Sequence, residues 1–223
     1  MITVHHLDHS RSNRVLWLLE ELELPYEIRV YKRNETTMLA PKELKDIHPL
    51  GKSPVLEDGS IKVAESGAII AYLLETYGNG RLQPKPNSAD WRHFQYFLHY
   101  AEGSLMPLLL LGLVFSRISK PPVPIIIRPF ARLLEIGMQQ KLIGPQYKSN
   151  FDFLDKELSS RPWFAGESFS AADIQMSYPL EAAASRGLTN NKAHITKWIR
   201  AIQSRPAYQR AIARGGPVAF DNL

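Results

Sequence analysis

A stretch near residue 50 constrains the fold of this chain more than any other part of its sequence. Residues 48–59 read His-Pro-Leu-Gly-Lys-Ser-Pro-Val-Leu-Glu-Asp-Gly. The pattern predicts a β-hairpin over residues 55–64 with its turn at Asp58-Gly59. A helix is expected to begin at Glu65 or Ser66, because apolar residues follow at helical spacing. This order places a short hairpin directly beside a helix N-terminus.

Three kinds of recognition group meet in this stretch. Lys52 supplies a cation just before the first strand of the hairpin. Pro54 cannot donate to a β-ladder, so we expect the start of its strand to lie at a sheet edge, where an extended peptide can pair. Glu65 and Ser66 occupy a helix N-terminus, where free N–H groups favour a carboxylate. A ligand with two carboxylates, an amine and a peptide-like backbone fits all three, and glutathione is such a ligand.

Composition removes several classes of chemistry. The 223 residues include no Cys, which excludes disulfides, thiolate metal sites and a cysteine nucleophile, so any thiol must arrive on the ligand. The net charge of +5 comes from scattered cations, a pattern that favours small anions and no nucleic acid. His5 and His6 are neighbours on a predicted strand and point to opposite faces, so no metal site is expected.

Nothing in the sequence predicts a membrane protein. The N-terminus lacks a basic segment followed by an apolar run, so no signal peptide is expected. The most apolar segment, residues 105–115, contains Pro107 and spans 11 residues. A membrane-spanning helix needs about 20. We therefore expect a cytoplasmic protein with no membrane contact.

The order of elements predicts two domains. Residues 1–80 alternate as β-α-β-α-β-β-α, which indicates α/β architecture with helices packed on a mixed four-stranded sheet. Residues 81–87 are Pro-rich and form a linker, and residues 88–223 are helical in pattern. Long helices are expected over residues 91–115 and 129–158. Ser170 and Asp173 have the spacing of a capping box, which gives Asp173 a structural role.

Several motifs occur in the order found in one known family. After an N-terminal strand they are Ser-Arg-Ser-Asn-Arg-Val-Leu-Trp-Leu-Leu-Glu-Glu-Leu over residues 10–22, the His-Pro-Leu-Gly-Lys-Ser-Pro-Val-Leu run, Glu65-Ser66, and Phe-Ala-Gly-Glu-Ser-Phe-Ser-Ala-Ala-Asp-Ile over residues 164–174. Together they resemble the cytosolic glutathione S-transferases, and among these the serine-type bacterial and fungal branch. The resemblance covers nearly the whole chain. It implies a thioredoxin-like N-terminal domain, an all-helical C-terminal domain, a homodimer, and an enzyme of detoxification that conjugates glutathione to hydrophobic electrophiles.

In this family a hydroxyl near the first helix stabilises the sulfur of glutathione. The resemblance assigns this role to Ser10, which would donate a hydrogen bond to the thiolate. A free thiol has a pKa of about 8.5, so help is needed at neutral pH. Asn13 is the second candidate and Ser12 the third, since both lie in the same loop and are good helix caps. The first strand and its loop contain no Tyr, so the tyrosine-type mechanism is not expected.

The resemblance also implies how glutathione is held. Lys52 would bind its glycyl carboxylate, Glu65 its ammonium group and Ser66 its γ-glutamyl carboxylate. Pro54 would be a cis-proline that presents the backbone of the next residue to the cysteinyl unit. His48 stands where the family often has Asn. It either helps to bind the glycyl end of glutathione or only lines the turn. The predicted glutathione-binding residues are His48, Lys52, Ser53, Pro54, Val55, Glu65 and Ser66.

A pocket for the second substrate is harder to place. A buried helical core explains apolar residues of the long helix equally well. The segment 115–132 carries a run of Ile and is expected to reshape the pocket entrance or to contact a partner chain. The candidate pocket residues are Tyr100, Met106, Leu110 and Phe115.

Two other functions remain open from the sequence. Glutathione-dependent peroxidase or disulfide reductase activity could use the same cleft without any protein Cys. A non-enzymatic interaction module with a transferase fold is the third reading. The complete set of Lys52, Pro54, Glu65 and Ser66 argues against a decayed site.

Overall fold

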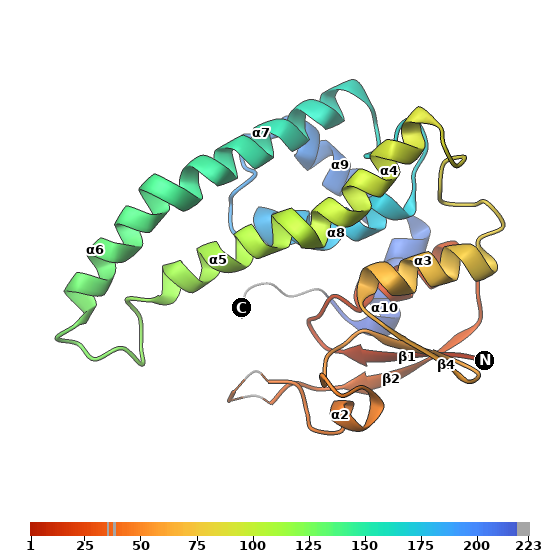
Figure 1. Cartoon of the computed structure of the whole chain (residues 1–223), viewed down its shortest axis with the longest axis horizontal. Coiled ribbons are helices and arrows are strands. Elements are labelled where there is room, and N and C mark those ends of the chain that lie inside the picture. The colour runs from red at the N-terminus through yellow and green to blue at the C-terminus, as the bar shows by residue number, and fades with distance from the viewer. Residues whose placement is uncertain (35, 38, 218–223) are drawn as a thin grey trace.

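A mixed four-stranded sheet forms the core of the N-terminal domain in the computed structural model, which describes residues 1–34, 36–37 and 39–217 (Figure 1). The strand order is β2-β1-β3-β4. β1 is parallel to β2 and antiparallel to β3, and β3 is antiparallel to β4. The predicted α/β domain with a mixed sheet is therefore confirmed. The strands are β1 (Ile2–Leu7), β2 (Tyr26–Tyr31), β3 (Val55–Asp58) and β4 (Ile61–Ala64).

The strand after Pro54 does not lie at the sheet edge, so that expectation is wrong. β3 is an inner strand, paired with β1 on one side and β4 on the other. Its ladder begins at Val55, which pairs with His5 and Ala64. Pro54 precedes the first paired residue, so its missing N–H removes no ladder hydrogen bond. The Ser53–Pro54 peptide bond is cis, as the family resemblance implied.

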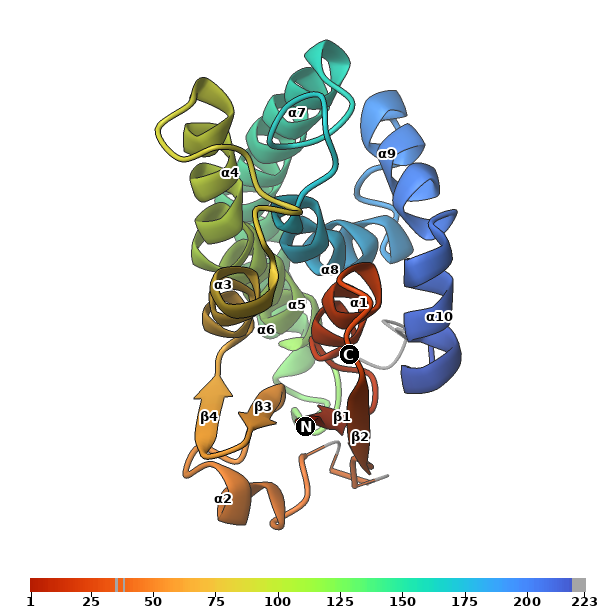
Figure 2. The same cartoon turned by 90° about the vertical axis from the view of Figure 1, so that its right-hand side faces the viewer.

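Helix α1 joins the two halves of the molecule. It lies between the sheet and the helical domain and packs against α3, α8 and α10 (Figure 2). Its residues 13–19 are all buried, including the charged Arg14. A helix buried on every side is typical of the centre of a protein rather than its surface. The helices of this half are α1 (Asn13–Glu21), α2 (Leu44–Ile47) and α3 (Ser66–Tyr77).

The second half is helical, as predicted. Helix α8 runs through its centre, with residues 171–183 buried. Two π-helical turns, η1 and η2, connect helices without a break. The elements are α4 (Ala89–Tyr100), η1 (Ala101–Leu105), α5 (Met106–Arg117), α6 (Arg128–Met138), η2 (Gln139–Ile143), α7 (Gly144–Ser160), α8 (Ala171–Ser185), α9 (Ala193–Gln203) and α10 (Pro206–Gly215).

The first long helix expected over residues 91–115 is confirmed and extends two residues further at each end. Through η1, α4 and α5 form one helix, Ala89–Arg117, of 29 residues. By length and composition alone this helix could cross a membrane. Phe94, Phe97 and Leu98 of this helix pack into the core of the protein.

Helices α5 and α6 project from the body of the molecule as an arm (Figure 1). No residue of α6 is buried. Ile126 is 87% exposed and Phe130 73% exposed. The Ile run predicted to reshape a pocket or meet a partner thus lies at the exposed end of this arm.

Helix α10 returns to the N-terminal domain and is fixed on α1 by ion pairs. Arg210 and Arg214 both contact Glu20, with N–O distances of 2.7 and 3.1 Å. Arg205 contacts Glu21 at 2.6 Å. These pairs hold the last helix against the C-terminal end of α1.

Candidate active site

A cavity of about 230 Å³ opens between the hairpin, the start of α3 and the turn η1. Its walls are more polar than those of a typical apolar ligand pocket. Six of the seven predicted glutathione-binding residues line it, and Val55 is fully buried behind them. The lining residues are Arg11, His48, Leu50, Lys52, Ser53, Pro54, Ala64, Glu65, Ser66 and Glu102.

Glu65 and Ser66 stand where the sequence placed them, at the start of α3. Glu65 precedes the helix with a φ of +72°, a conformation that is uncommon for a residue other than glycine. Strained backbone of this kind is concentrated at functional sites. Ser66 is the first helical residue, so free N–H groups of α3 face the cavity beside its hydroxyl.

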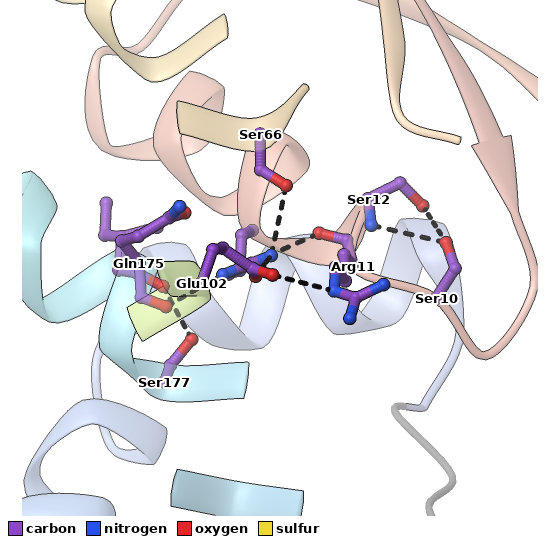
Figure 3. Close-up of polar contacts among 9 residues, drawn as sticks. Ser10, Arg11, Ser12, Ser66, Glu102, Gln175 and Ser177 are labelled. Carbon is purple, nitrogen blue, oxygen red and sulfur yellow. Dashed lines mark hydrogen bonds and ion pairs between the residues drawn. The ribbon is translucent and has the colours of Figure 1, made fainter. Parts of the chain in front are cut away.

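A buried arginine fixes this corner of the cavity. Arg14 donates from Nη2 to Ser66 Oγ at 3.0 Å and to Glu102 Oε1 at 2.6 Å. Its Nη1 donates to the carbonyl of Gln175 at 2.8 Å (Figure 3). Burial lowers the pKa of Arg14 from its ordinary value, and the carboxylate of Glu102 opposes this shift. One side chain thus connects α1, α3, η1 and α8.

Glu102 enters the site from a π-helical turn. Such turns are rare and occur frequently at functional sites. Its second oxygen, Oε2, lies 3.3 Å from Nε of Arg11, so a carboxylate between two guanidinium groups forms one wall of the cavity. The guanidinium groups of Arg11 and Arg14 also lie 5.6 and 5.3 Å from the ring centre of Tyr178.

The sequence analysis missed these charged residues of the site. The signal for Arg14 was its place within the apolar face of a helix, since a buried Arg must be paired. Glu102 gave a weaker signal, as the only acidic residue of the helix expected over residues 91–115. Neither could be matched to its partner without the fold.

Ser10 and Ser12 lie in the loop that leads into α1, on either side of the cavity residue Arg11, and Asn13 is the first residue of the helix. Ser10 is 5% exposed and its Oγ lies 2.7 Å from Ser12 Oγ. The N–H of Ser12 also donates to Ser10 Oγ at 3.3 Å. Ser12 is fully buried, and Asn13 donates to the carbonyl of Gly216 at 3.1 Å. All three candidates thus make contacts inside the protein, and none of them is among the residues that line the cavity.

The loop before β3 is attached to β1 by a serine. Ser53 Oγ donates to the carbonyl of His5 at 2.8 Å and accepts from the N–H of Leu7 at 3.0 Å. This contact places the neighbouring Lys52, which is exposed, at the cavity mouth. His48 Nδ1 accepts from the N–H of Leu50 at 3.4 Å, so the ring supports the turn that it lines.

The four candidates for a second-substrate pocket do not line this cavity. Tyr100 lies in the helical core, 8% exposed, with its hydroxyl bonded to Asn150. Leu110 is 54% exposed, and Phe115 is partly buried. Met106 packs against Tyr178, the ring beside the two guanidinium groups. The structure therefore does not bring the four together at one site.

Asp173 has the structural position expected of a capping box. Its Oδ2 accepts from the N–H of Ser170 at 3.0 Å. Its Oδ1 accepts from the N–H of Phe164 and from Nε1 of Trp198, each at 3.0 Å. The carboxyl group is fully buried and lies away from the cavity.

Comparison with known proteins identifies the family. Residues 1–75 match the glutathione S-transferase N-terminal domain, and residues 143–206 match the glutathione S-transferase C-terminal domain. Glutathione S-transferase 3 of Schizosaccharomyces pombe is 37% identical over 209 residues, covering 93% of this chain and 85% of that protein. Glutathione S-transferase 1 of Saccharomyces cerevisiae is also 37% identical, covering 93% and 92%. The chain belongs to the glutathione S-transferase family.

Solved structures agree with this assignment. A glutathione S-transferase from Actinobacillus pleuropneumoniae has a TM-score of 0.81 and 32% identity, with 100% of this chain and 97% of that chain covered. A sphingomonad glutathione S-transferase complexed with glutathione has a TM-score of 0.71 at 21% identity, with 96% and 98% covered, and shares the fold. The thioredoxin-like sheet domain and the helical domain of this transferase are thus those of its family.

Proposed function

We propose that this protein is a glutathione transferase that binds glutathione in the cavity beside Glu65, stabilises its thiolate and conjugates it to a hydrophobic electrophile. The observation that carries the proposal is the meeting of Lys52, Glu65 and Ser66 around one polar cavity at the N-terminus of α3. Curated relatives at 37% identity named as transferases support it.

The charges of the cavity match those of glutathione from end to end. The γ-glutamyl carboxylate binds at Ser66, where the helix N-terminus and Arg14 favour an anion. The ammonium group binds at Glu65, and the glycyl carboxylate at Lys52, with His48 nearby. The cysteinyl unit then lies along Pro54 and Val55, which directs its sulfur toward the loop of Ser10.

Ser10 is the residue we propose to stabilise the thiolate. Its hydroxyl lies just before α1, so both a hydrogen bond and the helix N-terminus favour a negative sulfur. Stabilising and orienting a nucleophile in this way supplies much of the rate enhancement of an enzyme. Asn13 is the weaker candidate, because its amide already donates to the carbonyl of Gly216.

Turnover of an aryl halide by wild type and by Ser10→Ala tests the proposal. We expect wild type to bind immobilised glutathione and to form the conjugate. The variant should retain binding and lose most of the turnover. Full turnover in the variant would move the role to another residue, and failure of wild type to bind glutathione would support a non-enzymatic module.

We also propose a homodimer in the cytoplasm, with the arm of α5 and α6 in the interface. Monomeric proteins rarely expose a large contiguous apolar patch, and this arm presents exposed Leu110, Val114, Phe130 and Leu133. Light scattering coupled to size exclusion tests it: wild type should have twice the mass of one chain, and Phe130→Asp should lower it.

Conjugation is preferred over reduction of peroxides or disulfides. A relative from Escherichia coli named disulfide-bond oxidoreductase is 25% identical, below the 37% of the two yeast transferases. Comparing rates with an aryl halide, a hydroperoxide and a mixed disulfide separates these reactions. The fastest should be conjugation.

A further inference from the structure

A line of hydrogen bonds leads from Ser10 into the protein and ends at helix α10. Ser10 Oγ lies 2.7 Å from Ser12 Oγ, and Ser12 Oγ lies 2.7 Å from Nδ1 of His6. On the far side of the ring, Nε2 of His6 lies 2.8 Å from the carbonyl oxygen of Gly215. Groups from the active-site loop, β1 and α10 therefore form one continuous chain.

The direction of each hydrogen bond follows from the last contact. A carbonyl oxygen only accepts, so Nε2 of His6 carries a proton and donates it to Gly215. In the neutral ring, Nδ1 is then an acceptor. The Ser12 hydroxyl lies 2.7 Å from this nitrogen and 3.3 Å from the carbonyl oxygen of Leu7, so it donates to the nearer Nδ1. Ser12 has one hydroxyl proton, so it accepts from Ser10. With its own proton turned inward, Ser10 offers lone pairs to a thiol outside.

Burial keeps His6 in this neutral form before ligand binds. Desolvation lowers the pKa of His6 below its ordinary value of 6.5. The Gly215 carbonyl and the charge of Asp8 raise it, and His9 lowers it. Helix α1 contributes the neutral side chains of Ser12 and Asn13 to this region. An acceptor is therefore present at the inner end of the chain at neutral pH.

We propose that His6 accepts the thiol proton of bound glutathione through the hydroxyls of Ser10 and Ser12. The inference rests on the proposed function. The S–H bond breaks and its proton moves to Ser10 Oγ, while the proton of Ser10 moves to Ser12 Oγ and that of Ser12 moves to Nδ1 of His6. The products are a thiolate and an imidazolium, with no change in the total number of protons.

The transfer also reverses the hydrogen bonds between His6, Ser12 and Ser10, while Nε2 of His6 continues to donate to Gly215. Nδ1–H of His6 now donates to Ser12, the Ser12 hydroxyl donates to Ser10, and the Ser10 hydroxyl points outward. Ser10 then donates to the thiolate, which is the role proposed for it above. One set of groups thus accepts the proton from the thiol and afterwards stabilises the anion that remains.

Two features favour this route over loss of the proton to water. Ser10, Ser12 and His6 are 5%, 0% and 1% exposed, so solvent has little access to the chain. The imidazolium forms at the C-terminus of α10, where the last-turn carbonyl of Gly215, which accepts from His6, and the helix dipole favour a cation. The thiolate forms near the N-terminus of α1, where the dipole has the opposite sign.

The direct test observes the protonation of His6 in the wild-type protein. Nitrogen-15 NMR of imidazole-labelled protein at pH 7 distinguishes neutral histidine from imidazolium, and a His6→Gln sample identifies the His6 signals among the seven histidines. We expect His6 to be neutral without ligand and to become imidazolium with glutathione. It should stay neutral with S-methylglutathione, which binds similarly and has no thiol proton.

Variants test the path of the proton. The pKa of the bound thiol, followed by thiolate absorbance, should rise by about one unit or more in Ser12→Ala and His6→Gln, which corresponds to about tenfold less thiolate at a pH below both values. Ser12→Thr keeps the hydroxyl and should restore the low pKa. His5→Gln is the matched control, because His5 contacts Tyr31 and Glu57 on the other face of β1.

The outcomes separate this inference from the proposed function. Formation of the thiolate with His6 still neutral would overturn the proposed proton transfer to His6 and leave the transferase assignment intact. An unchanged thiol pKa in Ser12→Ala would do the same. Absence of glutathione binding in wild type, measured by calorimetry, would overturn both.

Discussion

Replacing Asp173 with Ala should strongly destabilise this protein, although the residue lies away from the cavity. The carboxylate accepts hydrogen bonds from the N–H groups of Phe164 and Ser170 and from Nε1 of Trp198. It thereby joins the start of α8 to the preceding loop and to α9. All of these groups are buried, so water cannot replace the carboxylate without rearrangement.

The expected size follows from the groups left without a partner. A buried donor without an acceptor costs about 1–3 kcal/mol, and Asp173→Ala leaves three N–H donors. Burial of the charged carboxylate, in contrast, destabilises the wild-type protein, and it raises the pKa of Asp173 from 3.8 to about 6. Removing the charge at pH 7 therefore recovers part of the loss. We expect the free energy of unfolding to fall by about 3–5 kcal/mol.

Asp173→Asn is the matched variant, because it removes the charge and keeps one oxygen for Phe164 and Trp198. It should cost about 1–2 kcal/mol, mainly through the N–H of Ser170. The raised pKa gives the pH dependence its sign: the contribution of Asp173 is present below about pH 4 and is lost as pH rises through about 6. Relative to Asp173→Asn, wild type should lose stability across this window.

Urea unfolding followed by tryptophan fluorescence, at several pH values, measures all three proteins. A loss below about 1 kcal/mol in Asp173→Ala would refute the reasoning from unpaired donors. Equal losses in the Ala and Asn variants would show that the charge, and not the hydrogen bonds, determines the stability.

Three further predictions concern the cavity and its surroundings. Lys52→Met should raise the KM for glutathione about fivefold and leave kcat nearly unchanged in steady-state assays, because an exposed ion pair contributes about 1 kcal/mol. Arg14→Met should lower the free energy of unfolding by about 3 kcal/mol in urea titrations, since it removes the donor to the buried Ser66 hydroxyl and to the Gln175 carbonyl and leaves Glu102 with Arg11 alone. Because burial lowers the pKa of His6, its contribution to stability is present above pH 6.5 and is lost as pH falls below that value. His6→Gln should therefore reduce the fall of the urea unfolding midpoint between pH 7 and pH 5.

The sequence was a good guide wherever one local pattern decides the structure. The order of elements over residues 1–80 predicted the mixed four-stranded sheet, and Asp58-Gly59 placed the hairpin turn. The spacing of Ser170 and Asp173 predicted the capping box because both partners lie within one helical turn.

Features that depend on distant partners were beyond local patterns. The inner position of β3 depends on β1, about fifty residues earlier, and Pro54 alone suggested an edge instead. Likewise, Arg14 and Glu102 are 88 positions apart, so only the fold shows that they are partners.

The contact between His6 and Gly215 also has a consequence for the biosynthesis of the protein. It joins positions 209 residues apart, and domains emerge from the ribosome and fold in order from the N-terminus. The sheet can therefore form early, while the carbonyl that orients His6 arrives only when α10 has been translated. A nascent chain halted before α10 lacks this carbonyl, so under the proposed proton transfer thiol activation begins only after the last helix has been translated.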